Sequence, residues 1–271
     1  MTARASGRVA VVTGASRGLG AGLAAHFAAA GMHLGLCARH TPALAVRTRP
    51  TAHDGHVARA ETPVLAALDV TDRAALERFA DEVVARFGRI DLWVNNAGLL
   101  GDIRPLAEAD PHASARTVEV NVTGTLHGSA VFAAHVRRRA GPGVLVNLSS
   151  GAASAPYEGW AAYCASKAAV DQLTRVVELE EARHGLRAYA LSPGLVDTDM
   201  QTAIRGADAA WFPERERFRR VAELERFNSP GWVGDHILRL AFGPERPESV
   251  ILRIPDQPSK SDAPSPSGLA R

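Results

Sequence analysis

Thr13-Gly14-Ala15-Ser16-Arg17-Gly18-Leu19-Gly20 is a glycine-rich turn that directly follows a short apolar run at Val9–Val12. The spacing has a physical reason at each glycine: the first allows a tight turn from strand to helix, the second lets a phosphate approach the backbone, and the third allows close helix packing. A helix that begins here offers free N–H groups and a partial positive charge to a pyrophosphate. The turn alone could also be an ordinary strand-to-helix connection. It lacks the lysine of a P-loop, which argues against an ATPase or a GTPase.

Outward from this turn, short apolar runs alternate with long segments rich in alanine, leucine and arginine. The runs that predict buried strands are Val9–Val12, His33–Cys37, Val64–Leu68, Leu92–Asn95, Val144–Leu148 and Ala188–Leu191. The segments that predict helices are Gly18–Ala30, Arg73–Phe87, Ser114–Arg139 and Ala162–His184. This alternation indicates βαβ units and a parallel sheet covered on both faces. We therefore expect an α/β fold, a Rossmann-like, doubly wound parallel sheet with helices on both faces.

The sequence of 271 residues predicts one long domain followed by a short tail. Residues 1–254 carry the strand and helix pattern and are expected to form one nucleotide-binding catalytic domain. Within it, residues 199–228 have no strand signal and hold a dense run of charges, which predicts either an inserted helical lid over the substrate or a solvated helix. Residues 255–271 are rich in proline and serine, which predicts a disordered tail.

Composition excludes several classes of protein. With 31 basic and 29 acidic residues the formal net charge is +2, which argues against nucleic acid or an anionic membrane as a partner. Two cysteines cannot make a disulfide-stapled module, and no cluster of His, Cys and Asp has metal-ligand spacing, so no metal is expected. No apolar run is long enough for a membrane span or a signal peptide, and the expected compartment is the cytoplasm.

Six further short motifs follow the turn in order along the chain. They are Asp69-Val70, Asn95-Asn96-Ala97-Gly98, Asn121, Ser149-Ser150, Tyr163-x-x-x-Lys167 and Pro193-Gly194. In this order and spacing, residues from about 8 to 254 resemble the short-chain dehydrogenase/reductase family. The segment from Pro193 to Gln201 and the later Ser229-Pro230 resemble its sepiapterin reductase and bacterial benzil reductase branch. The resemblance implies an NADPH-dependent carbonyl reductase that transfers hydride to a small ketone or diketone, with a tyrosine as general acid.

Tyr163 and Lys167 are four residues apart on a predicted helix, so they share one face. We expect the ammonium to lower the pKa of the phenol toward the working pH of a general acid, although a surface tyrosine beside a solvated lysine would show the same spacing. Ser150, thirteen residues before the tyrosine, is expected to polarise a substrate carbonyl, while Ser149 points the other way. By resemblance, Asn121 kinks its helix and holds a water in a proton relay to the lysine; a simple helix irregularity is the alternative.

The resemblance, together with the glycine turn, implies a row of cofactor contacts. The residues expected to bind the cofactor are Gly14, Ser16, Arg17, Gly18, Leu19, Gly20, Arg39, Asp69, Val70, Asn96, Ala97, Gly98, Tyr163, Lys167, Pro193, Gly194, Val196 and Thr198. The second strand ends without the acid that binds both ribose hydroxyls of NAD. Two guanidinium groups, Arg17 and Arg39, instead suit a 2′-phosphate, which predicts NADP(H). The alternative is that both arginines lie on the surface without binding the cofactor.

Two other functions remain open at this point: an NAD-dependent alcohol dehydrogenase of the same fold, and a non-catalytic NADP-binding sensor. The long alanine-rich helices 114–139 and 162–184 pair between subunits in the family, which implies a homodimer or homotetramer. The residues expected to wall an apolar substrate pocket are Tyr157, Trp160, Leu99, Trp211 and Phe212. Tyr157 has Ala161 four residues on, which supplies no cation, so it is not expected to be the acid.

Overall fold

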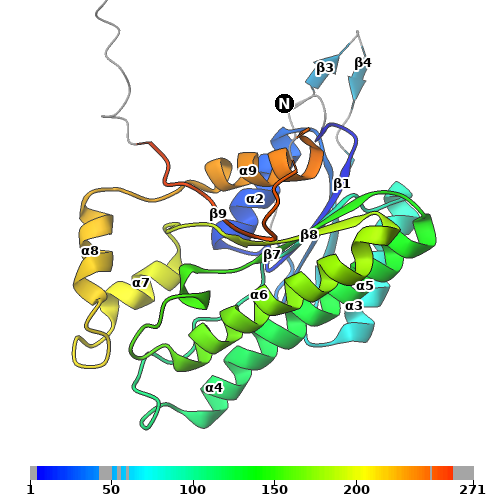
Figure 1. The fold of residues 1–271 in the computed structure, drawn as a ribbon. Helices are drawn as coiled ribbons and strands as arrows, with labels where there is room; N and C mark the ends of the chain where they lie inside the picture. The colour runs from blue at the N-terminus through cyan, green and yellow to red at the C-terminus, as the bar shows by residue number, and fades with distance from the viewer. Residues whose placement is uncertain (1–4, 43–50, 54–55, 59–60, 245, 259–271) are drawn as a thin grey trace, which may run out of the picture.

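A computed structural model describes residues 5–42, 51–53, 56–58, 61–244 and 246–258. In this part of the chain, seven parallel strands form the central sheet in the order β5-β2-β1-β6-β7-β8-β9 (Figure 1). Their bounds are β1 Val9–Thr13, β2 His33–Ala38, β5 Val64–Ala67, β6 Leu92–Asn95, β7 Gly143–Leu148, β8 Leu186–Ser192 and β9 Ile251–Arg253. All six expected strands are present, and the doubly wound parallel sheet is confirmed. The seventh, β9, was not predicted because three residues are too short to show a pattern.

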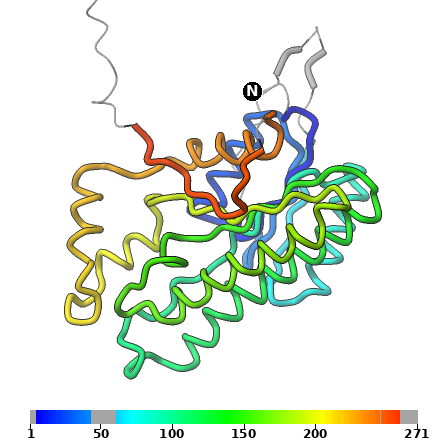
Figure 2. Tube along the Cα trace, in the orientation of Figure 1, coloured from blue at the N-terminus to red at the C-terminus, as the bar shows by residue number. Residues whose placement is uncertain are grey.

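Helices cover both faces of the sheet, as expected (Figures 1 and 2). On one face lie α2 (Gly18–Ala29) and α9 (Pro230–Phe242), which pack on each other. On the other lie α3 (Arg73–Phe87), α5 (Gly124–Arg139) and α6 (Ala161–Glu181). Among the residues that the structure describes, no helix is long and apolar enough to cross a membrane.

The core has two layers because the sheet buries both of its faces. Along β1, Ala10 and Val12 belong to the apolar cluster under α2 and α9, whereas Val9 and Val11 belong to the cluster under α3 and α5. All five residues of this strand are buried. Alternate residues of a strand point to opposite faces, so a strand that serves two cores must be apolar throughout.

The helix expected over 114–139 consists of three pieces. It begins earlier, as α4 at Pro111–Val118, where the Asp110 side chain accepts a hydrogen bond from the N–H of His112. A π-helical turn, Glu119–Thr123, then separates α4 from α5. This turn contains Asn121, the residue at which an irregularity of the helix was expected.

The segment expected to be a helical lid contains two short helices, α7 (Asp199–Gly206) and α8 (Arg215–Glu223). Both lie at one edge of the molecule, beyond the carboxyl ends of the strands (Figure 1). A small antiparallel hairpin of β3 (Thr51–His53) and β4 (His56–Ala58) was not predicted, since its sequence shows no apolar alternation. Of the expected tail, residues 259–271 lie outside the described residues.

Candidate active site

A cavity of about 750 Å³ opens at the carboxyl ends of the parallel strands. Ligands bind at this edge of open α/β sheets because the loops that follow the strands converge there. The cavity brings together every residue expected to bind the cofactor, and also Ser150 of the expected catalytic group. Asn121 is the one expected catalytic residue that does not line it. In the described residues no group of three or more His, Cys, Asp or Glu side chains could hold a metal ion.

The glycine turn has the form that a pyrophosphate requires. Gly14 has a φ of 66°, and a Cβ atom added there would lie 2.7 Å from the Cα of Ala97, so a side chain would be both strained and obstructed. The N-terminus of α2 has no side-chain cap and no acidic residue in its first turn. Its backbone N–H groups therefore remain available for an anion. These residues fit a dinucleotide cofactor.

Asn96 fastens the end of β6 to this turn. Its Nδ2 donates to the carbonyl oxygens of Thr13 (2.9 Å) and Gly14 (3.2 Å). The Thr13 Oγ1 in turn accepts from the backbone N–H groups of Asn96 and Ala97. The preceding Asn95 braces the sheet, as expected, because its Nδ2 donates to the Oδ1 of Asn147 on β7 at 2.8 Å. The side chain of Asn96 therefore lines the cavity and also holds two parts of its wall together.

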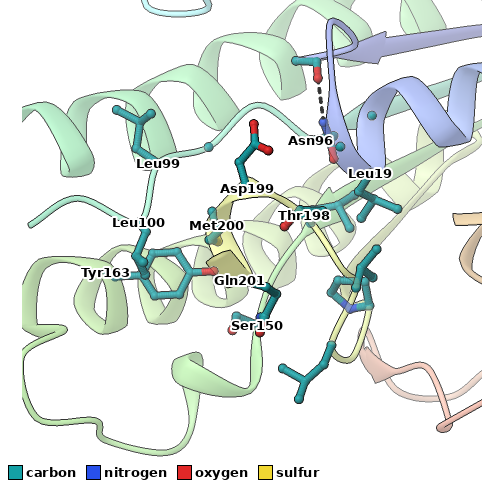
Figure 3. A pocket seen from close by; sticks show the side chains of 18 of the residues that line it. Leu19, Asn96, Leu99, Leu100, Ser150, Tyr163, Thr198, Asp199, Met200 and Gln201 are labelled. Atoms are coloured by element: carbon teal, nitrogen blue, oxygen red, sulfur yellow. Dashed lines mark hydrogen bonds between the residues drawn. The ribbon is translucent and has the colours of Figure 1, made fainter. Parts of the chain in front are cut away.

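Tyr163 and Ser150 reach the same part of the cavity from α6 and from the loop after β7 (Figure 3). The tyrosine is 7% exposed. Burial raises its pKa to about 12, and a hydrogen bond with Ser150 opposes the shift only in part. The expectation that Lys167 lowers the pKa of this phenol is wrong in this state, because removal from water disfavours the phenolate more than nearby groups favour it.

Lys167 lies beneath the tyrosine, with its Nζ 5.7 Å from the centroid of the Tyr163 ring. The Nζ donates to the carbonyl oxygen of Leu148 at 2.7 Å. Burial lowers the pKa of this ammonium to about 8, although the carboxylate of Asp171 opposes the shift. Ser149 also lines the cavity, and its hydroxyl donates to Asp171. The lysine ammonium is therefore buried, with one carbonyl partner and one nearby acid.

Asn121 lies in the π-helical turn, behind the cavity wall. Its Oδ1 accepts from the N–H of Leu99 at 2.7 Å, and its Nδ2 donates to the Leu99 carbonyl and to Ser166 Oγ. Its own carbonyl accepts from the Thr125 hydroxyl at 2.7 Å. The helix irregularity expected at this residue is present, and the side chain holds the loop that follows β6.

Charged residues surround the opposite end of the cavity. Arg39, exposed just after β2, and Arg17 both line it. The Arg17 Nη1 lies 2.8 Å from Asp199 Oδ2, and both side chains are about 70% exposed. Asp69 is held by the N–H and hydroxyl of Thr71 and by Arg116. Partial burial raises the pKa of Asp69, but these hydrogen bonds and the Arg116 charge outweigh it, so the pKa lies below its ordinary value.

Aromatic and apolar side chains form the remaining wall. Tyr157, Trp160 and Leu99 line the cavity, as expected, but Trp211 and Phe212 do not. Phe212 is fully buried behind Trp160, where the two rings stack at 4.8 Å, and Trp211 packs against the Arg104 guanidinium. Several of the lining residues that sequence reasoning did not name come from the two helices of the lid segment: Met200, Gln201 and Ile204 from α7, and Arg217, Phe218 and Val221 from α8.

Comparison with known proteins agrees with this arrangement. Residues 8–209 match the family model described as short chain dehydrogenase. A benzil reductase ((S)-benzoin forming) of Bacillus cereus is 28% identical over 255 residues, which cover 91% of this chain and 99% of that relative. The enzyme of the same name from Bacillus subtilis (strain 168) is 36% identical over 157 residues, covering 57% of this chain and 64% of the relative.

Among solved structures, the crystal structure of levodione reductase superposes with a TM-score of 0.78 at 26% identity, covering 92% of this chain and 96% of that one. The chain therefore belongs to the short-chain dehydrogenase family, and it stands close to the benzil reductase branch. As a member of this family it is an oxidoreductase that acts on CH–OH or carbonyl groups with a nicotinamide nucleotide. Both the family and the branch expected from the sequence are confirmed.

Burial of the Lys167 ammonium should lower the free energy of unfolding. A pKa lowered from 10.5 to about 8 corresponds to about 3 kcal/mol at roughly 1.4 kcal/mol per unit. Loss of the hydrogen bond to Leu148 offsets about 1 kcal/mol of this. We therefore expect Lys167→Met to raise the free energy of unfolding by about 2 kcal/mol at pH 7, measured by urea denaturation of the cofactor-free protein.

The stability difference between the two proteins should depend on pH. Below pH 8 the lysine is charged in the folded and in the unfolded state, so the folded protein bears the whole cost of burying the charge. Between pH 8 and 10.5 the lysine has lost its proton in the folded state but not in the unfolded state, and the free energy of unfolding of the wild type rises. The advantage of Lys167→Met should accordingly shrink over this interval. Parallel stability curves for the two proteins from pH 7 to 10.5 would contradict the argument.

Proposed function

We propose that this protein is an NADPH-dependent carbonyl reductase. The observation that carries the proposal is the pairing of Ser150 with a buried, protonated Tyr163 in a cavity that also holds the glycine turn. NADPH, when bound, supplies the hydride. The phenol with its raised pKa retains its proton at neutral pH, and that is the form a proton donor needs. The Ser150 hydroxyl donates to the substrate carbonyl oxygen and helps to polarise it.

The other residues predicted from the sequence bind the cofactor or take part in proton transfer. The free N–H groups after Gly14 bind the pyrophosphate, and Val196 and Thr198 lie in the loop after β8 that would bind the nicotinamide carboxamide. Lys167, with a pKa of about 8, holds the nicotinamide ribose and returns a proton to the tyrosine. Asn121 supports the relay by fixing the loop at Leu99 and by keeping the helix open in its π-helical turn.

An NAD-dependent alcohol dehydrogenase of the same fold is the alternative. Arg17 and Arg39 line the cavity and favour NADP(H), which argues against this alternative. The presence of both Tyr163 and Lys167 favours an enzyme over a non-catalytic sensor.

The substrate class is an aromatic ketone or diketone. The wall formed by Tyr157, Trp160, Phe218 and Met200 is apolar and largely aromatic, so it suits flat rings next to the reacting carbonyl. The relatives named benzil reductase act on a molecule of this kind, since benzil is an aromatic diketone. Benzil is therefore the first substrate to test.

Tyr163→Phe should lower kcat for benzil by about 100-fold or more, because it removes the proton donor. NADPH affinity, measured by fluorescence titration, should change by less than about twofold. Tyr189→Phe is the matched control: it removes the same hydroxyl from β8, outside the cavity, and should keep its activity. Near-normal turnover by Tyr163→Phe would remove this tyrosine from its assigned role. Failure of the wild type to oxidise NADPH with any carbonyl compound would favour the sensor.

We propose NADP(H) rather than NAD(H) because two arginines flank the end of the cavity beyond β2. Arg39 follows the strand where an acid would select NAD, and this strand ends in Ala38. The ion pair of Arg17 with Asp199 is exposed, and exposed pairs contribute only about 0–1 kcal/mol, so a 2′-phosphate can compete for this guanidinium.

Arg39→Asp should lower the ratio of kcat/KM for NADPH to that for NADH by about 10- to 100-fold, as the loss of a charge-assisted contact implies. Steady-state rates with each cofactor measure the ratio. Arg78→Asp makes the same change of charge on the exposed side of α3, away from the cavity, and should leave the ratio unchanged. A wild type that prefers NADH would overturn the assignment of the cofactor.

The outer surfaces of α5 and α6 support the expected oligomer. A groove of about 320 Å³ runs between them, lined mainly by Leu126, Ala130, Ala133, Leu173 and Val177. Leu126 is 44% exposed. Such an apolar face on paired helices suits a second copy of the chain.

Light scattering should accordingly give two or four times the 28.7 kDa of one chain. Leu126→Glu places a charge in the groove and should shift the mass toward one chain. A monomeric wild type would exclude this interface.

A further inference from the structure

Asp171 is a buried acid on α6 to which the proposed reaction assigns no part. Its side chain is 8% exposed. It follows Lys167 by four residues, so the two side chains lie on the same face of the helix. A charged group that is withdrawn from water needs a partner of opposite charge or a hydrogen bond. The surroundings of Asp171 therefore indicate what the carboxylate does.

Lys167 and Asp171 bind two consecutive residues at the end of β7. The Lys167 Nζ donates to the carbonyl oxygen of Leu148 at 2.7 Å. The Ser149 hydroxyl donates to Asp171 Oδ1 at 2.5 Å. The backbone N–H of Ser149 donates in turn to the carbonyl of Leu191 on β8 at 2.9 Å, which fixes the serine to the sheet. The end of β7 therefore holds the ammonium and the carboxylate in a fixed relation to each other.

The two charges support each other. Burial raises the pKa of Asp171, and the hydrogen bond from Ser149 and the charges of Arg175 and Lys167 oppose this shift. Burial lowers the pKa of Lys167, and the charge of Asp171 opposes that shift. Each of the two groups therefore favours the charged form of the other, against the effect of removal from water.

Other charged side chains on the helices packed against α6 have partners of their own. These are Arg116 of α4, which pairs with Asp69 and Glu119, and Arg137 of α5, which pairs with Glu181. The charges that act on Lys167 and Asp171 come from the pair itself and from the exposed Arg175, one turn further along α6.

The groups that face Lys167 from the side of the cavity are uncharged. A Cβ atom added at Gly98 would lie 3.8 Å from the Lys167 Nζ and 3.2 Å from the Oδ1 of Asn121. The ring of Tyr163, whose phenol is protonated, has its centroid 5.7 Å from the Nζ. Among the described residues, Asp171 is thus the acid that balances the charge of this lysine.

We propose that Asp171, oriented by Ser149, is a positioning residue that keeps the Lys167 ammonium charged at neutral pH. This rests on the proposed function, in which the lysine returns a proton to Tyr163. The phenolate takes a proton from the ammonium, which leaves a neutral amine, and the amine then takes a proton from solvent. A neutral amine is a far weaker acid than an ammonium, so proton return fails once the lysine loses its charge.

The sequence permits a direct measurement, because it contains two lysines, Lys167 and Lys260. Full-length protein labelled with [ε-¹³C]lysine should give two lysine signals, and Lys260→Arg removes the second. The pKa of Lys167 in the wild type should be about 8. Asp171→Asn keeps the shape of the side chain and removes its charge. It should lower the pKa of Lys167 by about one pH unit, because one nearby opposite charge is lost.

Asp81→Asn is the matched control. It makes the same change on the exposed side of α3, outside the cavity, and should leave the pKa of Lys167 where it is. A pKa of Lys167 that is the same in Asp171→Asn as in the wild type would overturn the proposal.

The reciprocal measurement does not depend on the folding of Asp171→Asn. Coupling between two sites acts equally in both directions. Lys167→Met should therefore raise the pKa of Asp171 by about one pH unit, measured by NMR titration of its side-chain carboxyl carbon. An unchanged pKa of Asp171 in Lys167→Met would equally overturn the proposal.

The pH profile of benzil reduction separates this role from a merely structural one. In Asp171→Asn, the fall of kcat at alkaline pH should begin about one pH unit lower than in the wild type, because the lysine loses its proton earlier. At lower pH, kcat should stay within about twofold of the wild type. Asp171→Glu keeps the charge and should restore the profile. A loss of kcat by the same factor at every pH would mean that Asp171 only supports the fold, and the proposal would be wrong.

The two measurements distinguish this proposal from the proposed function. If the wild type reduces benzil with NADPH, but Asp171→Asn changes neither the pKa of Lys167 nor the pH profile, the role of Asp171 is wrong and the carbonyl reductase stands. If Asp171→Asn lowers the pKa of Lys167, but the wild type reduces no carbonyl compound, the proposed reaction is wrong and the control of the lysine charge by Asp171 stands.

Discussion

The side-chain amide of Asn96 joins the end of β6 to the turn after β1, and the geometry of the cavity depends on this junction. The hydrogen bonds to Thr13 and Gly14 keep two strand ends level, while Val12, Val94 and Val146 align β1, β6 and β7 in parallel register. From the end of β7 the chain presents first the Leu148 carbonyl and then Ser150. The anion-binding turn and the reacting groups are therefore fixed to one rigid edge rather than carried on independent loops.

Removal of water is the second constraint on the site. Burial raises the pKa of Tyr163 to about 12, lowers that of Lys167 to about 8, and raises that of Asp171. In all three groups the shift favours the uncharged form, as a region of low dielectric constant requires. The cavity thus keeps a proton on the phenol, and the cost to the stability of the folded protein falls on Lys167, whose charged ammonium is buried.

The sequence predicted the sheet well because strands buried on both faces leave apolar runs that need no context to be recognised. It also predicted that the glycine turn and Ser150 lie at the same edge of the sheet, since the carboxyl ends of parallel strands meet there. It failed where the answer depends on packing. The pKa of Tyr163 depends on burial, which no spacing reveals, and Phe212 was expected to face the cavity although it stacks behind Trp160.

The lining residues of α7 and α8 were missed for a related reason. In α8 only Phe218 is buried, and the charged residues around it make the segment look like a solvated helix. Gln201 gave no signal at all, because a single glutamine belongs to no pattern that would place it in the wall of a cavity.

The π-helical turn Glu119–Thr123 also constrains how this chain can change in length. It accommodates one residue more than an α-helix would, because its turn is wider. Deleting a single residue here would restore a continuous α-helix with little rotation of α5 against α4, but it would remove the wide turn that places Asn121 against Leu99 and Ser166. Deletions are usually tolerated in exposed loops. In this buried stretch the number of residues is as much a part of the site as their identity.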